Sequence, residues 1–376
     1  MGRQIQKSER VLGSGNTVAR SRYLTGSYEI FVEGDDLYAS MLDEISRAQR
    51  HVFLETYIFR DDVVGQMFVA ALSHAAERGI DVVLRVDAFG SFGAISNMTI
   101  QSLRKAGVVF HWSYVWNWRQ PFQYNRRNHR KVLLIDDRAV FLGGYNIGDE
   151  NSTAVMGSGR WRDTHIRLPG AFVEPMLAII GQSKNARNVW CPDWRKSSFL
   201  IPNYGRKCRY RLRCVLRRAI DEARERIWIT TPYFVVDRHT RKALKAAACR
   251  GIDVRLMVPG KSDVALVRWA AHVSYETLLR RKVKIYEFQD RILHAKTMLI
   301  DTDWSMIGSS NFDYRSFYVN DEVNFISDER ELNSAFSEIF EDDMTYGAII
   351  LGSDWMQRSI FSRAAEFVGW ITRKWL

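Results

Sequence analysis

The chain contains two copies of one pattern, and this duplication restricts the possible folds more than any other feature. Arg-Gly-Ile-Asp at residues 78–81 leads into an apolar run, and the same four residues at 250–253 do so again. In both copies a helix-like stretch comes first, the glycine ends it, and a buried strand follows. A repeat of this length predicts two related halves.

A further pair of matching elements lies upstream in each copy. Helix-like residues 45–48 precede an expected strand over 51–59, and residues 220–223 precede one over 226–234. Alternating helices and strands favour parallel α/β layers joined by right-handed crossovers. We therefore expect an α/β fold in which each half is a mixed, mostly parallel sheet flanked by helices.

Each half also carries the same sparse set of polar residues at identical internal spacing. The first set is His129, Lys131, Asp136 and Asn146, and the second is His294, Lys296, Asp301 and Asn311. A histidine and a lysine two apart on a strand point to the same face, so both can reach one phosphate. One such pair alone says little, but two full copies on a repeated scaffold are hard to produce by packing needs.

These residues resemble the duplicated H-x-K-x-x-x-x-D signature of the phospholipase D superfamily, extended by G-G/S-x-N, over nearly the whole chain. Residues 144–150 of the first half and residues 311–322 of the other half resemble the bacterial cardiolipin synthase form of these motifs. The resemblance implies two pseudo-twofold related halves that face each other. It also implies one phosphodiester-binding site shared at their interface.

By this resemblance one histidine attacks phosphorus to give a phosphohistidine, and the other protonates the leaving oxygen and later deprotonates the acceptor. We favour His129 as nucleophile and leave the reverse assignment open. Lys131, Lys296, Asn146 and Asn311 are expected to bind the non-bridging phosphate oxygens. These groups supply the nucleophile, the proton and the cations, so no metal or other cofactor is expected.

The carboxylates divide into two kinds. In this family Asp136 and Asp301 look structural rather than chemical, although they belong to the motif. The acid that orients each histidine is expected further downstream. Glu322 fits that role for the second half and Asp163 for the first, and an ordinary exposed carboxylate is the alternative for each.

At 376 residues the chain exceeds one ordinary core. Residues 191–210 collect two prolines, an asparagine, a glycine and several basic residues, which is typical of a connecting loop. We predict an N-terminal tail over 1–25, a first half over 26–190, a linker over 191–210, a second half over 211–350 and a C-terminal amphipathic segment over 351–376.

Composition narrows the class of partner. Lys and Arg number 54 against 43 Asp and Glu, a net charge of +11 that favours phospholipid surfaces or nucleic acid. The four cysteines match neither a disulfide framework nor a zinc pattern, and we interpret them as free thiols in a reducing compartment. No secretory signal and no bilayer-spanning run is apparent, so we expect peripheral membrane contact, as in shorter bacterial cardiolipin synthases without N-terminal anchors.

Aromatic and basic residues crowd the segment before His129, a combination that suits the interfacial zone of an anionic membrane. The membrane-contact candidates in this segment are Trp112, Trp116, Trp118 and Arg126. Those in the C-terminal segment are Phe361, Trp370 and Trp375. The C-terminal group could form an in-plane anchor or pack on its own domain.

The favoured function is transfer of a phosphatidyl group between two phosphatidylglycerol molecules, giving cardiolipin and glycerol at the cytoplasmic face of the cell membrane. Phospholipase D hydrolysis to phosphatidic acid is the nearest alternative, because motifs do not encode water exclusion. A metal-independent nuclease is another, since aromatics with arginines also stack single-stranded bases, although nucleic acid is the less favoured partner. A non-catalytic membrane-binding protein would not need intact paired motifs.

Overall fold

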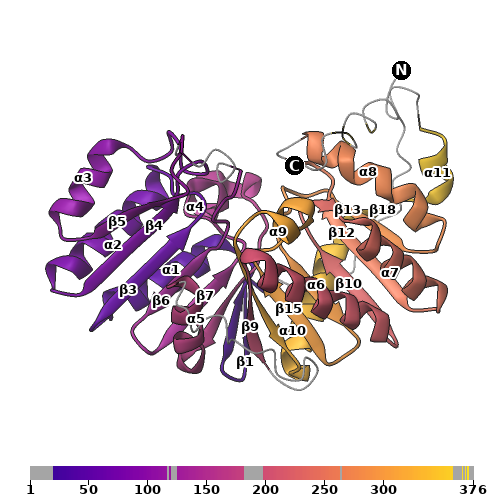
Figure 1. The fold of residues 1–376 in the computed structure, drawn as a ribbon, viewed down its shortest axis with the longest axis horizontal. Coiled ribbons are helices and arrows are strands. Elements are labelled where there is room, and N and C mark those ends of the chain that lie inside the picture. The colour runs from indigo at the N-terminus through magenta and orange to yellow at the C-terminus, as the bar shows by residue number, and fades with distance from the viewer. Residues whose placement is uncertain are drawn as a thin grey trace.

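Two eight-stranded sheets stand side by side in the computed structural model (Figure 1). The structure describes residues 20–116, 118–119, 125–181, 198–262, 265–358, 366, 369 and 371. The first sheet, in indigo and magenta, belongs to the half with the first motif, and the second, in orange, to the half with the second. The duplication in the sequence is thus a duplication of the fold.

The first half begins with a hairpin and continues with alternating helices and strands. Its elements are β1 (Arg22–Thr25), β2 (Tyr28–Phe31), α1 (Gly34–Ser46), β3 (His51–Thr56), α2 (Val63–Glu77), β4 (Asp81–Asp87), α3 (Asn97–Lys105), β5 (Val109–Ser113), β6 (Val132–Ile135), β7 (Ala139–Gly143), α4 (Thr153–Met156), β8 (His165–Pro169) and α5 (Val173–Ile180). The strand order is β1-β2-β8-β7-β6-β3-β4-β5. Gly79 adopts a φ of 84° just after α2, in the left-handed region that lets the helix stop before β4.

The second half repeats this order. Its elements are β9 (Phe199–Asn203), α6 (Gly205–Glu222), β10 (Arg226–Thr230), β11 (Phe234–Val235), α7 (Arg238–Cys249), β12 (Asp253–Pro259), α8 (Ala265–Leu279), β13 (Lys284–Phe288), β14 (Thr297–Ile300), β15 (Trp304–Gly308), β16 (Phe312–Asp313), α9 (Tyr314–Tyr318), β17 (Glu322–Ser327), α10 (Arg330–Thr345), β18 (Gly347–Ile349) and α11 (Gly352–Met356). The main sheet has the order β18-β13-β12-β10-β14-β15-β17-β9, and β11 pairs with β16 separately.

Both sheets are mixed, as predicted, but the expected predominance of parallel pairing was wrong. Within the described residues, only the pairs β3–β4 and β4–β5 of the first sheet and β10–β12 and β12–β13 of the second are parallel. Helices connect these strands. The strands that follow the His-Lys motifs are joined to their neighbours by tight hairpins, which require antiparallel pairing.

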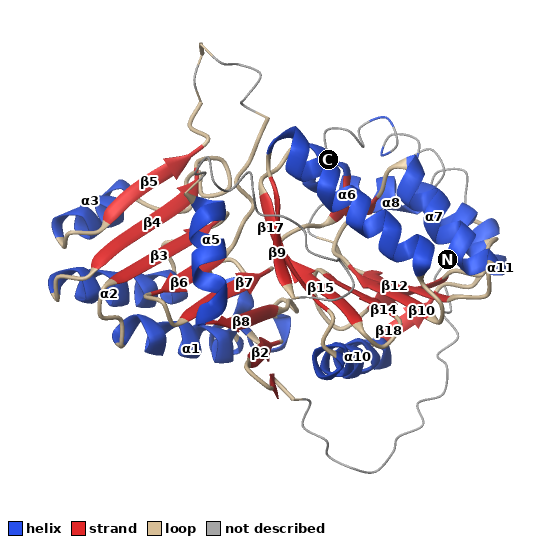
Figure 2. Cartoon of the chain, turned by 60° about the horizontal axis from the view of Figure 1, so that its bottom comes forward, coloured by secondary structure: helices blue, strands red, loops and turns tan. Residues whose placement is uncertain are grey.

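A shared apolar core holds the two halves together. Helices α1, α2 and α3 cover one face of the first sheet and α6, α7 and α8 one face of the second, whereas α5 and α10 lie on the opposite faces (Figure 2). One cluster of buried side chains contains Leu134 of β6 and Met176 of α5 together with Leu299 of β14 and Phe336 of α10. The halves are therefore packed against each other rather than loosely tethered.

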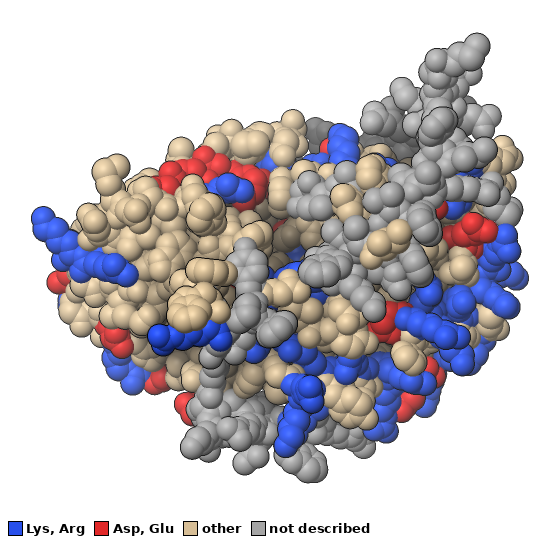
Figure 3. Space-filling model, turned by 45° about the horizontal axis from the view of Figure 1, so that its top comes forward, with Lys and Arg blue, Asp and Glu red and all other residues tan. Residues whose placement is uncertain are grey.

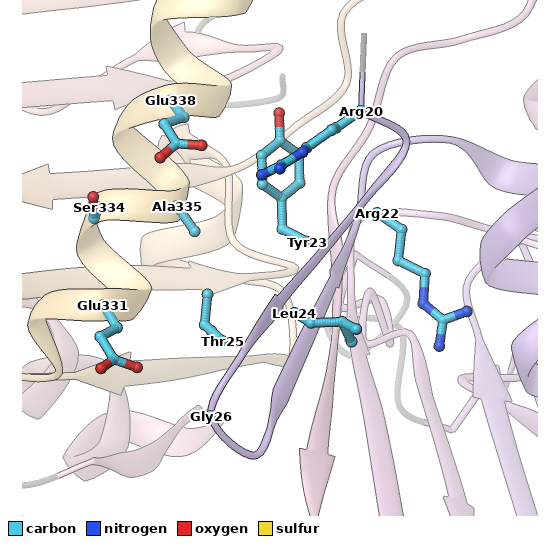
Figure 4. Close-up of a pocket in the computed structure, with 10 residues that line it drawn as sticks. All are labelled: Arg20, Arg22, Tyr23, Leu24, Thr25, Gly26, Glu331, Ser334, Ala335 and Glu338. Atoms are coloured by element: carbon cyan, nitrogen blue, oxygen red, sulfur yellow. The ribbon is translucent and has the colours of Figure 1, made fainter. Parts of the chain in front are cut away.

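The β1–β2 hairpin adds another contact between the halves. Tyr23 donates to a carboxylate oxygen of Asp342 over 3.1 Å, and Tyr28 donates to Glu329 over 2.7 Å. A pocket of about 530 Å³ lies between this hairpin and α10 (Figure 4). None of the residues that line it belongs to either His-Lys motif.

Two predicted boundaries were wrong. The expected tail takes in β1, and the expected linker contains the edge strand β9 and the start of α6. Pro202 lies in the edge strand β9, where its missing N–H is tolerated, and Gly205 begins α6 two residues after that strand ends, whereas Pro192 lies outside the described residues. Phe361, Trp370 and Trp375 lie outside the described residues. No helix in the described part of the chain is long and apolar enough to cross a membrane.

Candidate active site

The two His-Lys segments precede β6 and β14, and the backbone of each segment reaches across to the other half. The His129 amide donates to the carbonyl of Asp321 over 2.9 Å, and the His294 amide donates to the carbonyl of Arg162 over 2.7 Å. Each hydrogen bond thus pairs a motif segment with the backbone of the other half, at the residues that precede β17 and β8. The motifs therefore meet at one interface, as the shared-site prediction requires.

His129 is held by acceptors from the second half. Its Nδ1 lies 3.1 Å from both carboxylate oxygens of Glu322 and 3.2 Å from the carbonyl of Ser309. Because these neighbours are acceptors, Nδ1 carries the proton and Nε2 presents its lone pair. Glu322 is fully buried and accepts further hydrogen bonds from the hydroxyls of Ser309 and Ser316, over 2.5 Å and 2.8 Å.

His294 is held by an aspartate of the first half. Its Nδ1 lies 2.6 Å from Oδ2 of Asp163. Lys296 joins the same cluster, with Nζ 3.5 Å from that oxygen and 2.8 Å from Nδ1 of His294. The other carboxylate oxygen of Asp163 accepts from the amide of Thr164 over 2.7 Å.

The predicted pairing of each carboxylate with its own half was wrong. Glu322 contacts the histidine of the first half, and Asp163 contacts that of the second. The backbone bridges at Asp321 and Arg162 explain the exchange, because each bridge residue immediately precedes the carboxylate and delivers it across the interface. Sequence order alone does not show how the two halves face each other.

The small residue after each hairpin differs between the halves. A Cβ added to Gly144 would lie 2.0 Å from Oδ1 of Asp163, so only glycine leaves room for that carboxylate. The equivalent Ser309 instead uses its side chain to donate to Glu322. One half makes space for its carboxylate partner, and the other contributes a hydrogen bond.

Burial shifts the pKa values of His129 and Lys131, the basic pair of the first motif. It lowers the pKa of His129 to about 4, an effect that the Glu322 carboxylate opposes, and the imidazole is therefore neutral at neutral pH. It also lowers the pKa of Lys131 to about 7. Burial raises the pKa of Asp163, but Lys296 and His294 outweigh it and keep this carboxyl ionised. Lys296 also acts on the charge of Lys131, so all four basic groups belong to one site.

Asp136 and Asp301 occupy the turns after β6 and β14. Asp136 accepts from the amides of Gln49, Arg50 and His51 at 2.9–3.0 Å, and Asp301 accepts from the amides of three consecutive residues that begin at Arg224. Both adopt positive φ, 47° and 51°. These contacts fit the structural role predicted for the two aspartates.

The two asparagines are buried beside the hairpins that carry the glycines. Oδ1 of Asn146 accepts from the amide of Ile58 over 3.2 Å, which directs its amino group the other way. The backbone amide of Asn311 donates to the hydroxyl of Ser316 over 3.1 Å. The side-chain oxygen Oδ1 of Asn311 has no hydrogen-bond partner among the described residues. Phosphate binding by these side chains stays a prediction.

Two tyrosines of the site were missed. The ring of Tyr57 lies edge-on to His129 with centroids 5.0 Å apart, and Tyr233 lies 6.4 Å from His294 in the same way. Each follows the first parallel strand of its half, so the duplication itself was a usable signal. Nζ of Lys131 also lies 5.3 Å from the centre of the Tyr57 ring.

Two of the four membrane-contact candidates before His129 are exposed: Trp116 and Trp118 expose 64% and 68% of their surface. Trp112 is half-buried against the core and packs edge-on against Phe110, and membrane contact by it stays a prediction. Arg126 is engaged elsewhere, in an ion pair with Asp321 over 3.0 Å. Across the described residues, no group of three or more His, Cys, Asp or Glu is placed to hold a metal ion.

Comparison with known proteins decides the family. Residues 41–156 and 216–344 match the family described as cardiolipin synthase, PLD-like domain. The chain belongs to this family. Among curated proteins, the chain is similar to the cardiolipin synthases of Clostridium perfringens, 30% identical over 90% of this chain and 75% of theirs, and of Geobacillus kaustophilus, 34% identical over 92% and 71%.

The fold of this family member extends to more distant structures. A phosphatidylserine synthase from Haemophilus influenzae superposes with a TM-score of 0.69 at 14% identity, covering 94% of this chain and 93% of its own. A polyphosphate kinase from Porphyromonas gingivalis gives 0.61 at 15% identity over 89% and 50%. At these identities the likeness concerns the fold alone.

Proposed function

We propose that this PLD-like protein is a cardiolipin synthase, which transfers a phosphatidyl group from one phosphatidylglycerol to a hydroxyl of another. The observation that carries the proposal is the crossed arrangement of two buried His-carboxylate pairs with two buried lysines, in a chain of this family. The curated relatives that it matches are named cardiolipin synthases.

In the first step Nε2 of His129 attacks phosphorus, and the bond from phosphorus to the glycerol oxygen breaks. His294 gives its proton to that oxygen, so free glycerol leaves and a phosphatidyl-histidine is formed. The neutral state of His129 suits a nucleophile. The carboxylate of Asp163, 2.6 Å from Nδ1 of His294, stabilises positive charge on the ring that acts as acid.

In the next step a hydroxyl of another phosphatidylglycerol replaces glycerol. His294 takes the hydroxyl proton, the oxygen attacks phosphorus, and the bond to His129 breaks, which yields cardiolipin and restores both histidines. The ammonium groups of Lys131 and Lys296 offset charge on the non-bridging oxygens, with Asn146 and Asn311 as neutral donors. Hydrolysis would follow the same course with water as acceptor.

Because substrate and product are membrane lipids, we propose peripheral association with anionic phospholipids, at the cytoplasmic face of the membrane. The net charge of +11 supports attraction to such a surface.

The test is mass spectrometry of lipids after incubation with phosphatidylglycerol vesicles in chelator. Wild type should yield cardiolipin and glycerol, His129→Ala and His294→Ala should lose about three orders of magnitude in rate, and the exposed His239→Ala should match wild type. Phosphatidic acid alone would indicate a hydrolase. Unchanged turnover in both motif variants would contradict the proposed site.

A further inference from the structure

Six exposed apolar side chains gather on the loops of the first half. Phe89 and Phe92 lie between β4 and α3, Met98 lies in the first turn of α3, and three more follow β5. The six are Phe89, Phe92, Met98, Val115, Trp116 and Trp118, exposed by 57%, 86%, 80%, 60%, 64% and 68%. We call this set the apolar rim. So much exposed apolar surface in one place marks an interaction site rather than chance.

The apolar rim adjoins the edge of the sheet that carries His129. The carboxylate of Asp87, at the end of β4, accepts from the amide of Asn128, the residue before His129, over 2.8 Å. The Arg127 guanidinium lies 4.4 Å from the centre of the Phe89 ring. The amide of Ala88 donates to the carbonyl of Ser113, which joins the two rim loops. The rim is therefore continuous with the approach to the catalytic histidines.

The matching edge of the second half is charged. Counting from the end of β12, Lys261 stands where the first half has Phe89, and Arg238 and Lys242 are exposed at the start of α7. Figure 3 shows the contrast: the half on the left has few charges around the centre, whereas Lys and Arg gather on the right-hand half. The two edges that flank one site thus have opposite character.

We propose that the apolar rim inserts into the interfacial zone of an anionic bilayer while the basic edge of the second half rests on its headgroups. The inference rests on the proposed function, because it assigns how a lipid-transferring site is seated on its substrate surface. Tryptophan favours the headgroup boundary, and phenylalanine is typical of an apolar face that enters it. Arg119 lies 5.2 Å from the centre of the Trp118 ring, a pairing suited to that zone. Lysines add attraction that salt weakens.

Vesicle flotation with the full chain tests this docking surface. The double variant Phe92→Ser/Met98→Ser should weaken partitioning onto vesicles of phosphatidylglycerol and phosphatidylcholine by about tenfold or more. The matched control Leu24→Ser/Val109→Ser removes two apolar side chains that are also exposed, by 73% and 45%, away from the rim, and should bind as wild type. Lys242→Gln/Lys261→Gln should weaken binding about fivefold per lysine, only at low salt.

Turnover of a short-chain phosphatidylglycerol below its micelle concentration separates this inference from the proposed function. Rim variants should keep that turnover, and His129→Ala should lose it while still binding vesicles. Wild-type vesicle binding by the rim variant, or equal loss in the control, would overturn the docking surface. A change in oligomeric state with vesicle binding intact would also overturn it, because the rim would then join two copies of the chain.

Discussion

The two half-sites share one motif yet support their histidines differently. In the first, both carboxylate oxygens of Glu322 lie within hydrogen-bond distance of Nδ1 of His129, and two serine hydroxyls donate to the same carboxylate. In the second, the shorter Asp163 approaches His294 to 2.6 Å and also contacts Lys296. Glu322 is held by hydrogen bonds from serine hydroxyls, whereas Asp163 occupies the space that Gly144 leaves. The motif therefore sets the chemistry, and the residues around it differentiate the two histidines.

The largest expected difference between the half-sites concerns Gly144 and Ser309. Gly144→Ala places a methyl group on Asp163, so His294 loses its orienting carboxylate and kcat should fall by about 10²–10⁴-fold. Ser309→Ala removes one of several bonds to Glu322 and should cost only about tenfold. The measurement is kcat on short-chain phosphatidylglycerol, with circular dichroism to verify folding. Equal losses would mean that the two supports work alike.

The next prediction concerns the pH dependence of the first half-site. Activity needs His129 without its second proton, which holds above its pKa of about 4, and Lys131 with its proton, which holds below about 7. Hence kcat/KM should fall about tenfold per pH unit below the first value and above the second. Lys131→Arg keeps its charge to higher pH, so it should move the alkaline limb upward. An alkaline limb that stays in place would assign it to another group.

The smallest effect on catalysis, and the most symmetric, is expected at the motif aspartates. Asp136→Ala and Asp301→Ala each leave three backbone amides without an acceptor and place alanine at positive φ. Each should lower the free energy of unfolding by about 2–4 kcal/mol, measured by urea denaturation, with kcat of the folded enzyme little changed. The neighbouring Asp137→Ala, at an exposed ion pair, is the control and should cost under about 1 kcal/mol. A stable but inactive Asp136→Ala protein would make that aspartate chemical.

Sequence reasoning reached the repeated fold and the His-Lys pairs because both depend on local spacing. A histidine two residues before a lysine, a helix that stops at Gly79 or Gly251, and a run of buried strand residues are each specified within a few positions. Comparison with known proteins confirms the family inferred from these motifs. Glu322 and Asp163 were also singled out, because Glu322 begins a strand and Asp163 lies just before one, but each was assigned to the histidine of its own half.

What sequence could not supply are the relations between distant segments. The exchange of Glu322 and Asp163 between halves depends on packing across the interface, which no local spacing records. The partial burial of Trp112 against the core is likewise a tertiary effect. The edge strand β9 was not predicted because it contains Pro202, a residue that is more typical of loops. Phe89 and Phe92 were not predicted because exposure cannot be inferred from a short loop.

The exchange of carboxylates has a consequence for biosynthesis. As the chain leaves the ribosome, the first half emerges with His129 but without Glu322, which lies 193 positions later. A chain that ends before Glu322 would hold the His129 imidazole without the carboxylate that contacts it. The complete half-site therefore forms only when synthesis has reached Glu322 and both halves have docked.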